Sequence, residues 1–167
     1  MRVTGLDATP LFLDLARKDA AERGVEVEYV EGDMRSVPWV DRFDRVLCWF
    51  TSFGYFSDEE NRQVLAEAYR ALEPGGLLAI ELNNLLRLIQ VYADEVITER
   101  GDDKMIDRHR FDIQTSRSLD ERTIVRGGKR RSFEFSVRMF TPVELRSWML
   151  DAGFREDASS YNIACGY

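Results

Sequence analysis

The hydrophobic pattern in the first half of the chain switches repeatedly between short apolar runs and helical spacing. An apolar run over residues 3–6 precedes Thr9-Pro10, and apolar residues then recur every three to four positions up to Gly24. Thr is a frequent helix N-cap, Pro is tolerated at the first helical position and Gly favours the C-terminal end, so this segment predicts a helix. Residues 25–30 alternate apolar and acidic side chains and predict a second strand.

The same alternation of strands and helices continues to residue 84. Residues 43–50 have the β-branched and aromatic content of a buried strand. Ser57 and Glu60 have the spacing of a capping box, and helical spacing follows as far as Pro74-Gly75-Gly76. Residues 77–82 predict another strand. Residues 1–84 therefore have the pattern of an α/β portion, in which helices cover a parallel sheet.

The pattern changes after residue 84. Apolar residues over 85–96 predict a helix. Three strands are predicted next, at residues 104–112, 116–126 and 130–140, and the apolar residues Phe133, Phe135, Val137 and Met139 alternate strictly in the last of them. Gly127-Gly128 stands between the last two, where a tight hairpin turn is needed. We interpret residues 85–140 as a helix plus an antiparallel insertion that serves as a substrate cap.

Residues 141–167 predict a C-terminal helix and strand of the same domain. Thr141-Pro142 repeats the cap-plus-proline signal, and Gly153 ends the helical spacing. A last strand is predicted over residues 154–164.

Composition and charge narrow the possible functions. The chain has 167 residues, 44% of them hydrophobic, which suits one soluble domain. Thirty acidic against 23 basic residues give a formal charge of −7, which argues against binding to nucleic acids or anionic membranes. No apolar run approaches the roughly 18 residues of a membrane span. Two cysteines and one histidine make neither a disulfide framework nor a zinc cluster, so we expect a cytoplasmic protein without a metal.

Two carboxylates at predicted strand ends are the sharpest chemical feature. In doubly wound α/β folds ligands bind beyond the carboxyl ends of the strands, and a carboxylate there can accept both hydroxyls of a ribose. Asp7 is placed for that role, although it could instead only help to cap the following helix. Asp33 ends the next strand, where a carboxylate can accept the exocyclic amine of an adenine. The pair predicts a slot for an adenosine.

Four segments of this half resemble, in order and separation, the class I S-adenosylmethionine-dependent methyltransferases. They are Val3-Thr4-Gly5-Leu6-Asp7-Ala8-Thr9-Pro10, Glu31-Gly32-Asp33-Met34-Arg35, Phe43-Asp44-Arg45-Val46 and Ala71-Leu72-Glu73-Pro74-Gly75-Gly76-Leu77-Leu78-Ala79-Ile80. The segments Arg138–Leu145 and Ala152–Phe154 look like those of small-molecule methyltransferases with an antiparallel insertion. The resemblance implies a Rossmann-like, three-layer sheet flanked by helices.

The resemblance also implies the cofactor, S-adenosylmethionine or its product S-adenosylhomocysteine, and residues that bind it. Asp7 and Ala8 would hold the ribose, and Asp33, Met34 and Arg35 the adenine. Phe50, Thr51 and Phe53 would lie beside the methionine portion.

The sequence departs from the family at its first strand. The chain contains no Gly-x-Gly, whereas the first strand of the family ends in a glycine-rich loop. The family's first and last strands are apparently missing. Since the first strand is central in the family's sheet, its absence would leave two interior edges unpaired, and a homodimer could complete the sheet.

Candidates for the acceptor side are fewer. If the reaction uses a base, His109 is the one side chain that titrates near neutrality without a shift, although it could be only an exposed hairpin residue. Tyr55, Glu81 and Asn83 follow strand ends and could line the acceptor pocket, with Tyr55 also a catalytic candidate.

The predicted function is methyl transfer from S-adenosylmethionine to a small-molecule acceptor. Two alternatives stay open. One is a catalytically incomplete methyltransferase-like module for binding or dimerisation, and the other is an NAD-dependent oxidoreductase, whose cofactor ribose a strand-end acid can also hold.

Overall fold

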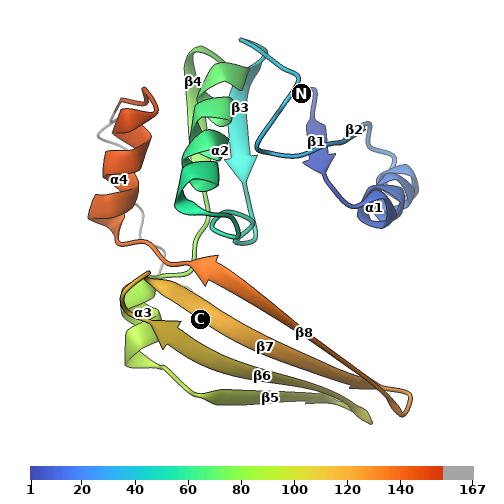
Figure 1. The fold of residues 1–167 in the computed structure, drawn as a ribbon. Coiled ribbons are helices and arrows are strands. Elements are labelled where there is room, and N and C mark those ends of the chain that lie inside the picture. The colour runs from blue at the N-terminus through green and yellow to red at the C-terminus, as the bar shows by residue number, and fades with distance from the viewer. Residues whose placement is uncertain (156–167) are drawn as a thin grey trace.

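The computed structural model describes residues 1–155 as an α/β body joined to a four-stranded antiparallel sheet (Figure 1). The elements of the body are β1 (Thr4–Asp7), α1 (Pro10–Glu22), β2 (Glu28–Glu31), β3 (Phe43–Cys48), α2 (Asp58–Ala71), β4 (Leu72–Ile80) and, later in the chain, α4 (Pro142–Asp151). The predicted α/β class with an antiparallel insertion is confirmed.

The helices of the body begin at the capping residues expected from the sequence. At α2 the capping box is complete, because Ser57 Oγ accepts from the Glu60 amide and the Ser57 amide donates to the Glu60 carboxylate. Thr141 Oγ1 caps α4 in the same way, by accepting from the Glu144 amide. Thr9 occupies the N-cap of α1, but its side chain makes no capping hydrogen bond.

The parallel strands form two separate pairs. β1 pairs with β2, with Asp7 opposite Glu31, and β3 pairs with β4, with Cys48 opposite Ile80. Within residues 1–155 no strand joins β1 to β3, so both strands have an unpaired edge, as predicted from the missing central strand. Apolar side chains near these edges and on α1 are consequently exposed, among them Leu47 and Leu11.

The second half of the chain forms one continuous antiparallel sheet. Its strands, in spatial order, are β5 (Glu95–Arg100), β6 (Asp103–Asp112), β7 (Arg117–Arg126) and β8 (Lys129–Arg138). Gly127 and Gly128 both have positive φ, 54° and 73°, and Arg126 pairs with Lys129. A two-residue loop with two positive φ angles is a type I′ turn, so the predicted hairpin is confirmed.

Two boundaries predicted from the sequence are wrong. The helix expected over 85–96 is α3 (Leu85–Gln90), and the residues after it enter β5, a strand that was not predicted. Val96, Ile97 and Thr98 are β-branched and pair with β6, which outweighs the local helical spacing. Pro74-Gly75-Gly76 lies within β4 rather than before it, at an irregularity in the β3–β4 register. The predicted strand over 154–164 falls almost wholly outside the described residues.

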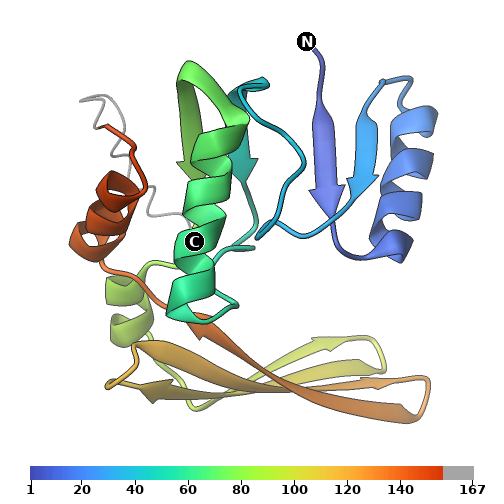
Figure 2. The same cartoon turned by 45° about the horizontal axis from the view of Figure 1, so that its top comes forward.

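The carboxyl ends of the parallel strands point toward the antiparallel sheet, as Figures 1 and 2 show for β1 and β3. The core of the body lies next to the end of β8; its buried cluster consists of Phe53, Val64, Leu65, Phe140 and Trp148. Arg138 lies beside this cluster with its side chain 8% exposed, and its guanidinium pairs with Asp58 of α2 and Glu144 of α4. The buried Arg138 guanidinium thus links the insertion to α2 and α4 through ion pairs with partly exposed carboxylates.

Candidate functional site

Asp7 and Asp33 lie next to each other at the ends of β1 and β2. The Gly32 amide donates to the Asp7 carbonyl at 3.1 Å, which places the start of the Asp33 loop against β1. Asp7 Oδ1 accepts from the Thr9 amide at 2.7 Å, so the carboxylate does help to cap α1. Its Oδ2 accepts no hydrogen bond within residues 1–155, and this oxygen can still accept from a ligand. Ala8, the neighbouring predicted residue, is exposed.

Asp33 is held as a carboxylate by Arg35. Its Oδ1 accepts from the Arg35 amide at 2.8 Å and from Nε at 3.0 Å, and its Oδ2 accepts from a terminal guanidinium nitrogen at 2.6 Å. These hydrogen bonds lower the pKa of Asp33. The Arg35 guanidinium also pairs with Glu60 and lies 4.3 Å from the ring centroid of Phe56. Arg35 therefore positions Asp33 instead of facing open solvent.

The residues around Asp33 fit the adenosine half of S-adenosylmethionine. A charged acceptor on Asp33, the Met34 amide, which donates to no acceptor in the described residues, and the open oxygen of Asp7 together match the hydrogen-bonding groups of an adenine and a ribose. For the methionine half, the glycine-rich loop of the family has no counterpart among residues 1–155, because the sequence contains no Gly-x-Gly.

The segment after β3 is a strained turn fixed by Glu81. Phe50 and Thr51 both have positive φ, 51° and 54°, which is unfavourable for residues with side chains. The Phe50 amide donates to Glu81 Oε2 at 2.8 Å. Glu81 thus has a structural contact within the predicted site. The Phe50 side chain is 84% exposed, whereas Phe53 is buried in the core, so of the two Phe50 has the surface to contact a ligand.

The same loop, residues 49–57, contacts both Arg35, which holds Asp33, and the antiparallel sheet. The Gly54 carbonyl accepts from the Arg138 amide at 2.8 Å. The next residue, Tyr55, stacks with Phe135 of β8 at a centroid distance of 6.3 Å, and Phe56 contacts Arg35. Tyr55 therefore lies between the predicted adenine site and the insertion. Asn83 is exposed and makes no hydrogen bond in the described part of the chain.

On the sheet itself, His109 pairs with Asp120. His109 Nδ1 lies 2.5 Å from Asp120 Oδ1, and the two residues are opposite each other in the β6–β7 register. Asp107 and Arg122 form a second ion pair on the same two strands, at 2.5 Å. Asp107, Asp120 and Arg122 could not be singled out from the sequence, because pairing across strands depends on register. The alternation along each strand, combined with a known register, would have indicated them.

Comparisons with known proteins find similarity to methyltransferases. Residues 1–76 match the model of a family described as a methyltransferase domain. The chain is 32% identical over 145 residues to the ubiquinone/menaquinone biosynthesis C-methyltransferase UbiE of Ruegeria sp. (strain TM1040), an alignment that covers 78% of this chain and 56% of that protein.

Solved structures show the same fold. The CcbJ methyltransferase from Streptomyces caelestis superposes with a TM-score of 0.79 at 22% identity, covering 92% of this chain and 64% of that one. CalS10 from Micromonospora echinaspora, an amino pentose methyltransferase solved with S-adenosylmethionine bound, superposes with a TM-score of 0.63 at 27% identity, covering 91% of this chain and 65% of that one. The family match over residues 1–76 and these structures support the resemblance to the class I S-adenosylmethionine-dependent methyltransferases.

The chain spans about a third to just over half of the length of the curated relatives it matches. Within residues 1–155, no helix is long and apolar enough to cross a bilayer. The same residues contain no cluster of three or more side chains that could bind a metal ion.

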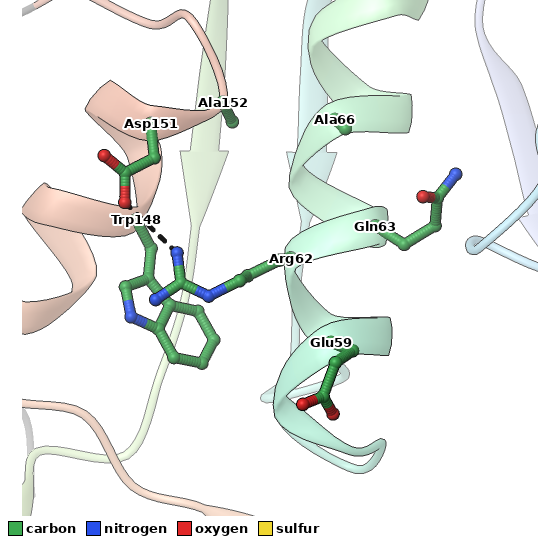
Figure 3. A pocket seen from close by; sticks show the side chains of 7 residues that line it. All are labelled: Glu59, Arg62, Gln63, Ala66, Trp148, Asp151 and Ala152. Atoms are coloured by element: carbon green, nitrogen blue, oxygen red, sulfur yellow. Dashed lines mark hydrogen bonds and ion pairs between the residues drawn. The ribbon is translucent and has the colours of Figure 1, made fainter.

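A pocket of about 300 Å³ between α2 and α4 lies apart from the predicted site. Figure 3 shows Arg62 reaching from α2 toward α4, where its guanidinium lies 4.0 Å from the Trp148 ring centroid and 3.1 Å from Asp151 Oδ2. None of the lining residues is one that the methyltransferase resemblance implies. We attribute this pocket to the packing of two helices of the fold.

Proposed function

We propose that this chain binds S-adenosylmethionine and transfers its methyl group to a small molecule. One observation carries the proposal: Asp7 and a pre-ordered Asp33 stand side by side at strand ends that point toward the antiparallel sheet. Ligands bind at this edge in open α/β sheets. The cap over that edge carries His109 and lies beside Tyr55.

Each group of residues at this site would bind a different part of the cofactor or the acceptor. Asp7 would accept the ribose hydroxyls, and Asp33 with the Met34 amide would bind the adenine, while Arg35 keeps Asp33 charged and oriented. The cofactor would supply a methyl group on a positively charged sulfur. Phe50 and Thr51 would lie beside the methionine portion, and Tyr55, Glu81 and Asn83 would line the acceptor side. Orientation of the two reactants can supply much of the rate.

The acceptor class is narrowed by the names of relatives. One is a methyltransferase of quinone biosynthesis and another methylates an amino pentose. Both names describe small molecules, and we propose the same general class for this chain. Because the chain has few cysteines and a negative charge, we place the reaction in the cytoplasm.

A second candidate function is a binding or dimerisation module without catalysis. The unpaired edges of β1 and β3, together with the absent Gly-x-Gly, favour it. Sedimentation would show whether the chain forms a homodimer, which this alternative requires for completing the sheet. No contact in the described residues favours the NAD-dependent oxidoreductase over either candidate.

Isothermal titration calorimetry with S-adenosylhomocysteine tests the proposal. We expect binding by the wild-type chain and at least a roughly tenfold loss of affinity in Asp7→Asn and in Asp33→Asn, since each removes a charged acceptor. Asp44→Asn, which changes an exposed carboxylate of β3, serves as the control and should bind like the wild type. No binding at millimolar ligand would overturn the proposal and favour the module, whereas preferential binding of NAD would favour the oxidoreductase.

A further inference from the structure

One face of the antiparallel sheet is turned toward the α/β body. Side chains alternate along strands, so those at positions 107, 109 and 111 of β6 share a face with those at 118, 120 and 122 of β7 and with 133, 135 and 137 of β8. Val137 is buried against Leu85 of α3, and Phe111 and Phe135 pack on the same cluster. Phe135, on the same face, stacks with Tyr55 of the loop after β3, so the face that carries His109 contacts the body at this loop.

The imidazole of His109 is fixed on this face by a buried carboxylate. Asp120 is 8% exposed, and its Oδ1 contacts His109 Nδ1 at 2.5 Å. The Ser118 hydroxyl donates to the same oxygen at 3.0 Å, and this second hydrogen bond helps to orient the carboxylate. The backbone of His109 is held as well, because its amide donates to the Asp94 carbonyl and its carbonyl accepts from the Tyr92 hydroxyl, both at 2.8 Å.

This pairing leaves the other ring nitrogen available. In a neutral imidazole one nitrogen donates and the other accepts, and a carboxylate on Nδ1 selects the form that carries its proton there. Nε2 is then an acceptor, and it has no hydrogen-bond partner within residues 1–155. The His109 side chain is 27% exposed, so its ring can be reached.

On this face, the charged side chains nearest to His109 are paired with each other, whereas the Nε2 atom of His109 has no hydrogen-bond partner within residues 1–155. Asp107 and Arg122, the nearest charged pair, neutralise each other through a hydrogen bond of 2.5 Å. Phe135, opposite Asp120, stacks with Tyr55, so aromatic surface lies beside the His109–Asp120 pair. This arrangement suits an acceptor that has a ring or an apolar portion and a polar reacting group.

We propose that His109 is the catalytic base of methyl transfer and that Asp120 is its positioning residue, for acceptors with an ionisable N–H or O–H. The inference rests on the function proposed above. As the acceptor forms its bond to the methyl carbon, the carbon–sulfur bond breaks with its electron pair left on sulfur, and the acceptor proton passes to His109 Nε2. Ser118 supports the orientation of Asp120.

The proposal that Asp120 positions His109 can be tested without any ligand. His109 is the sole histidine of the chain, so its ring signals can be assigned directly. Nitrogen NMR of chain labelled in its histidine ring reports one imidazole, and at alkaline pH it reports which nitrogen carries the proton. We expect the Nδ1–H form in the wild type, a shift toward the Nε2–H form in Asp120→Asn, and retention of the Nδ1–H form in Asp120→Glu. Asp103→Asn, which changes an exposed ion pair of the same sheet, is the matched control.

A wild-type spectrum in the Nε2–H form, or an Asp120→Asn spectrum identical to the wild type, would overturn the positioning role. Circular dichroism of each variant shows whether the sheet has folded, and Asp120→Glu keeps the test available if Asp120→Asn does not fold.

The catalytic part is tested by turnover with radiolabelled S-adenosylmethionine and two acceptor probes, an amino sugar and a phenol. For whichever probe is methylated, His109→Gln should lower kcat about 10²-fold or more, the usual contribution of a general base. Asp120→Asn should lower kcat with little change in the KM for S-adenosylmethionine, and Asp120→Glu should recover part of the loss.

Unchanged kcat in His109→Gln would overturn the base. If the wild type binds S-adenosylhomocysteine but methylates neither probe, the acceptor class is wrong. If it binds no S-adenosylhomocysteine, the proposed function itself fails, while the NMR result still decides the His109–Asp120 pair.

Discussion

The α/β body and the antiparallel sheet differ in how completely their strands are paired. In the body, β1 and β3 each have a single partner and one open edge, whereas in the antiparallel sheet β7 is paired along both edges for nearly its whole length. Antiparallel neighbours are joined by short turns, so the sheet is assembled from residues close in sequence. Parallel neighbours need crossovers, and a sheet built from them depends on segments far apart. The sheet is therefore self-contained, while the body depends on contacts from elsewhere.

The largest expected effect comes from breaking the link between the two regions. Arg138→Ala removes a buried guanidinium that pairs with the partly exposed carboxylates of Asp58 and Glu144, and it should cost about 2–3 kcal/mol in the free energy of unfolding. Urea denaturation measures this loss. Arg126→Ala, which removes an exposed ion pair with Asp103, should cost less than about 1 kcal/mol. Equal losses in the two variants would show that Arg138 does not join the regions.

A smaller effect is expected from disturbing the sheet alone. Gly128 has a φ of 73° and open space around its α-carbon, so the cost of a side chain there is conformational. Gly128→Val should lose roughly 1–2 kcal/mol of stability. Gly128→Asn should lose less, since Asn tolerates this conformation. Thermal unfolding of both variants gives the comparison, and equal stability of the two would argue against the type I′ turn.

Removing one cap from the body should have an effect of similar or smaller size. Ser57→Ala deletes the hydroxyl that accepts from the Glu60 amide, and about 1 kcal/mol of stability should be lost. Ser36→Ala, at an exposed serine whose hydroxyl makes no hydrogen bond in the described residues, is the control. Hydrogen exchange should show the loss first in the amides of α2. Faster exchange confined to the sheet would contradict the assignment.

The smallest of these effects on stability is expected from the protonation of Asp33 at acid pH, and it concerns the body. The pKa of Asp33 is lowered by hydrogen bonds from Arg35, so its carboxylate stabilises the folded state above the ordinary pKa. That contribution is lost as the pH falls through the lowered value, and the partial exposure of both side chains keeps it small. Urea midpoints measured between neutral and acid pH should decline more steeply for the wild type than for Asp33→Asn. Parallel declines would rule out this contribution.

Most elements could be predicted because their signals are local. The capping box at Ser57, the proline at position 142 and the two glycines at positions 127 and 128 each act within a few residues. The strand β5 was missed because its residues acquire strand character only through pairing with β6. Asp7 and Asp33 could be singled out by their place at strand ends, and their adjacency follows from the parallel β1–β2 pair.

By itself, the sequence determined the order of the elements other than β5 and the interruption of the parallel strands, and it placed Asp7 and Asp33 just after strands, since these depend on periodicity, caps and strand ends. Only the tertiary structure decided that Arg35 holds Asp33, that Glu81 fixes the turn at Phe50 and that Asp120 holds His109. The physical reason is distance along the chain for the last two: a hydrogen bond between strands depends on register, which no local pattern records. For Arg35 the reason is rotamer choice, because a guanidinium two residues away can equally point into solvent.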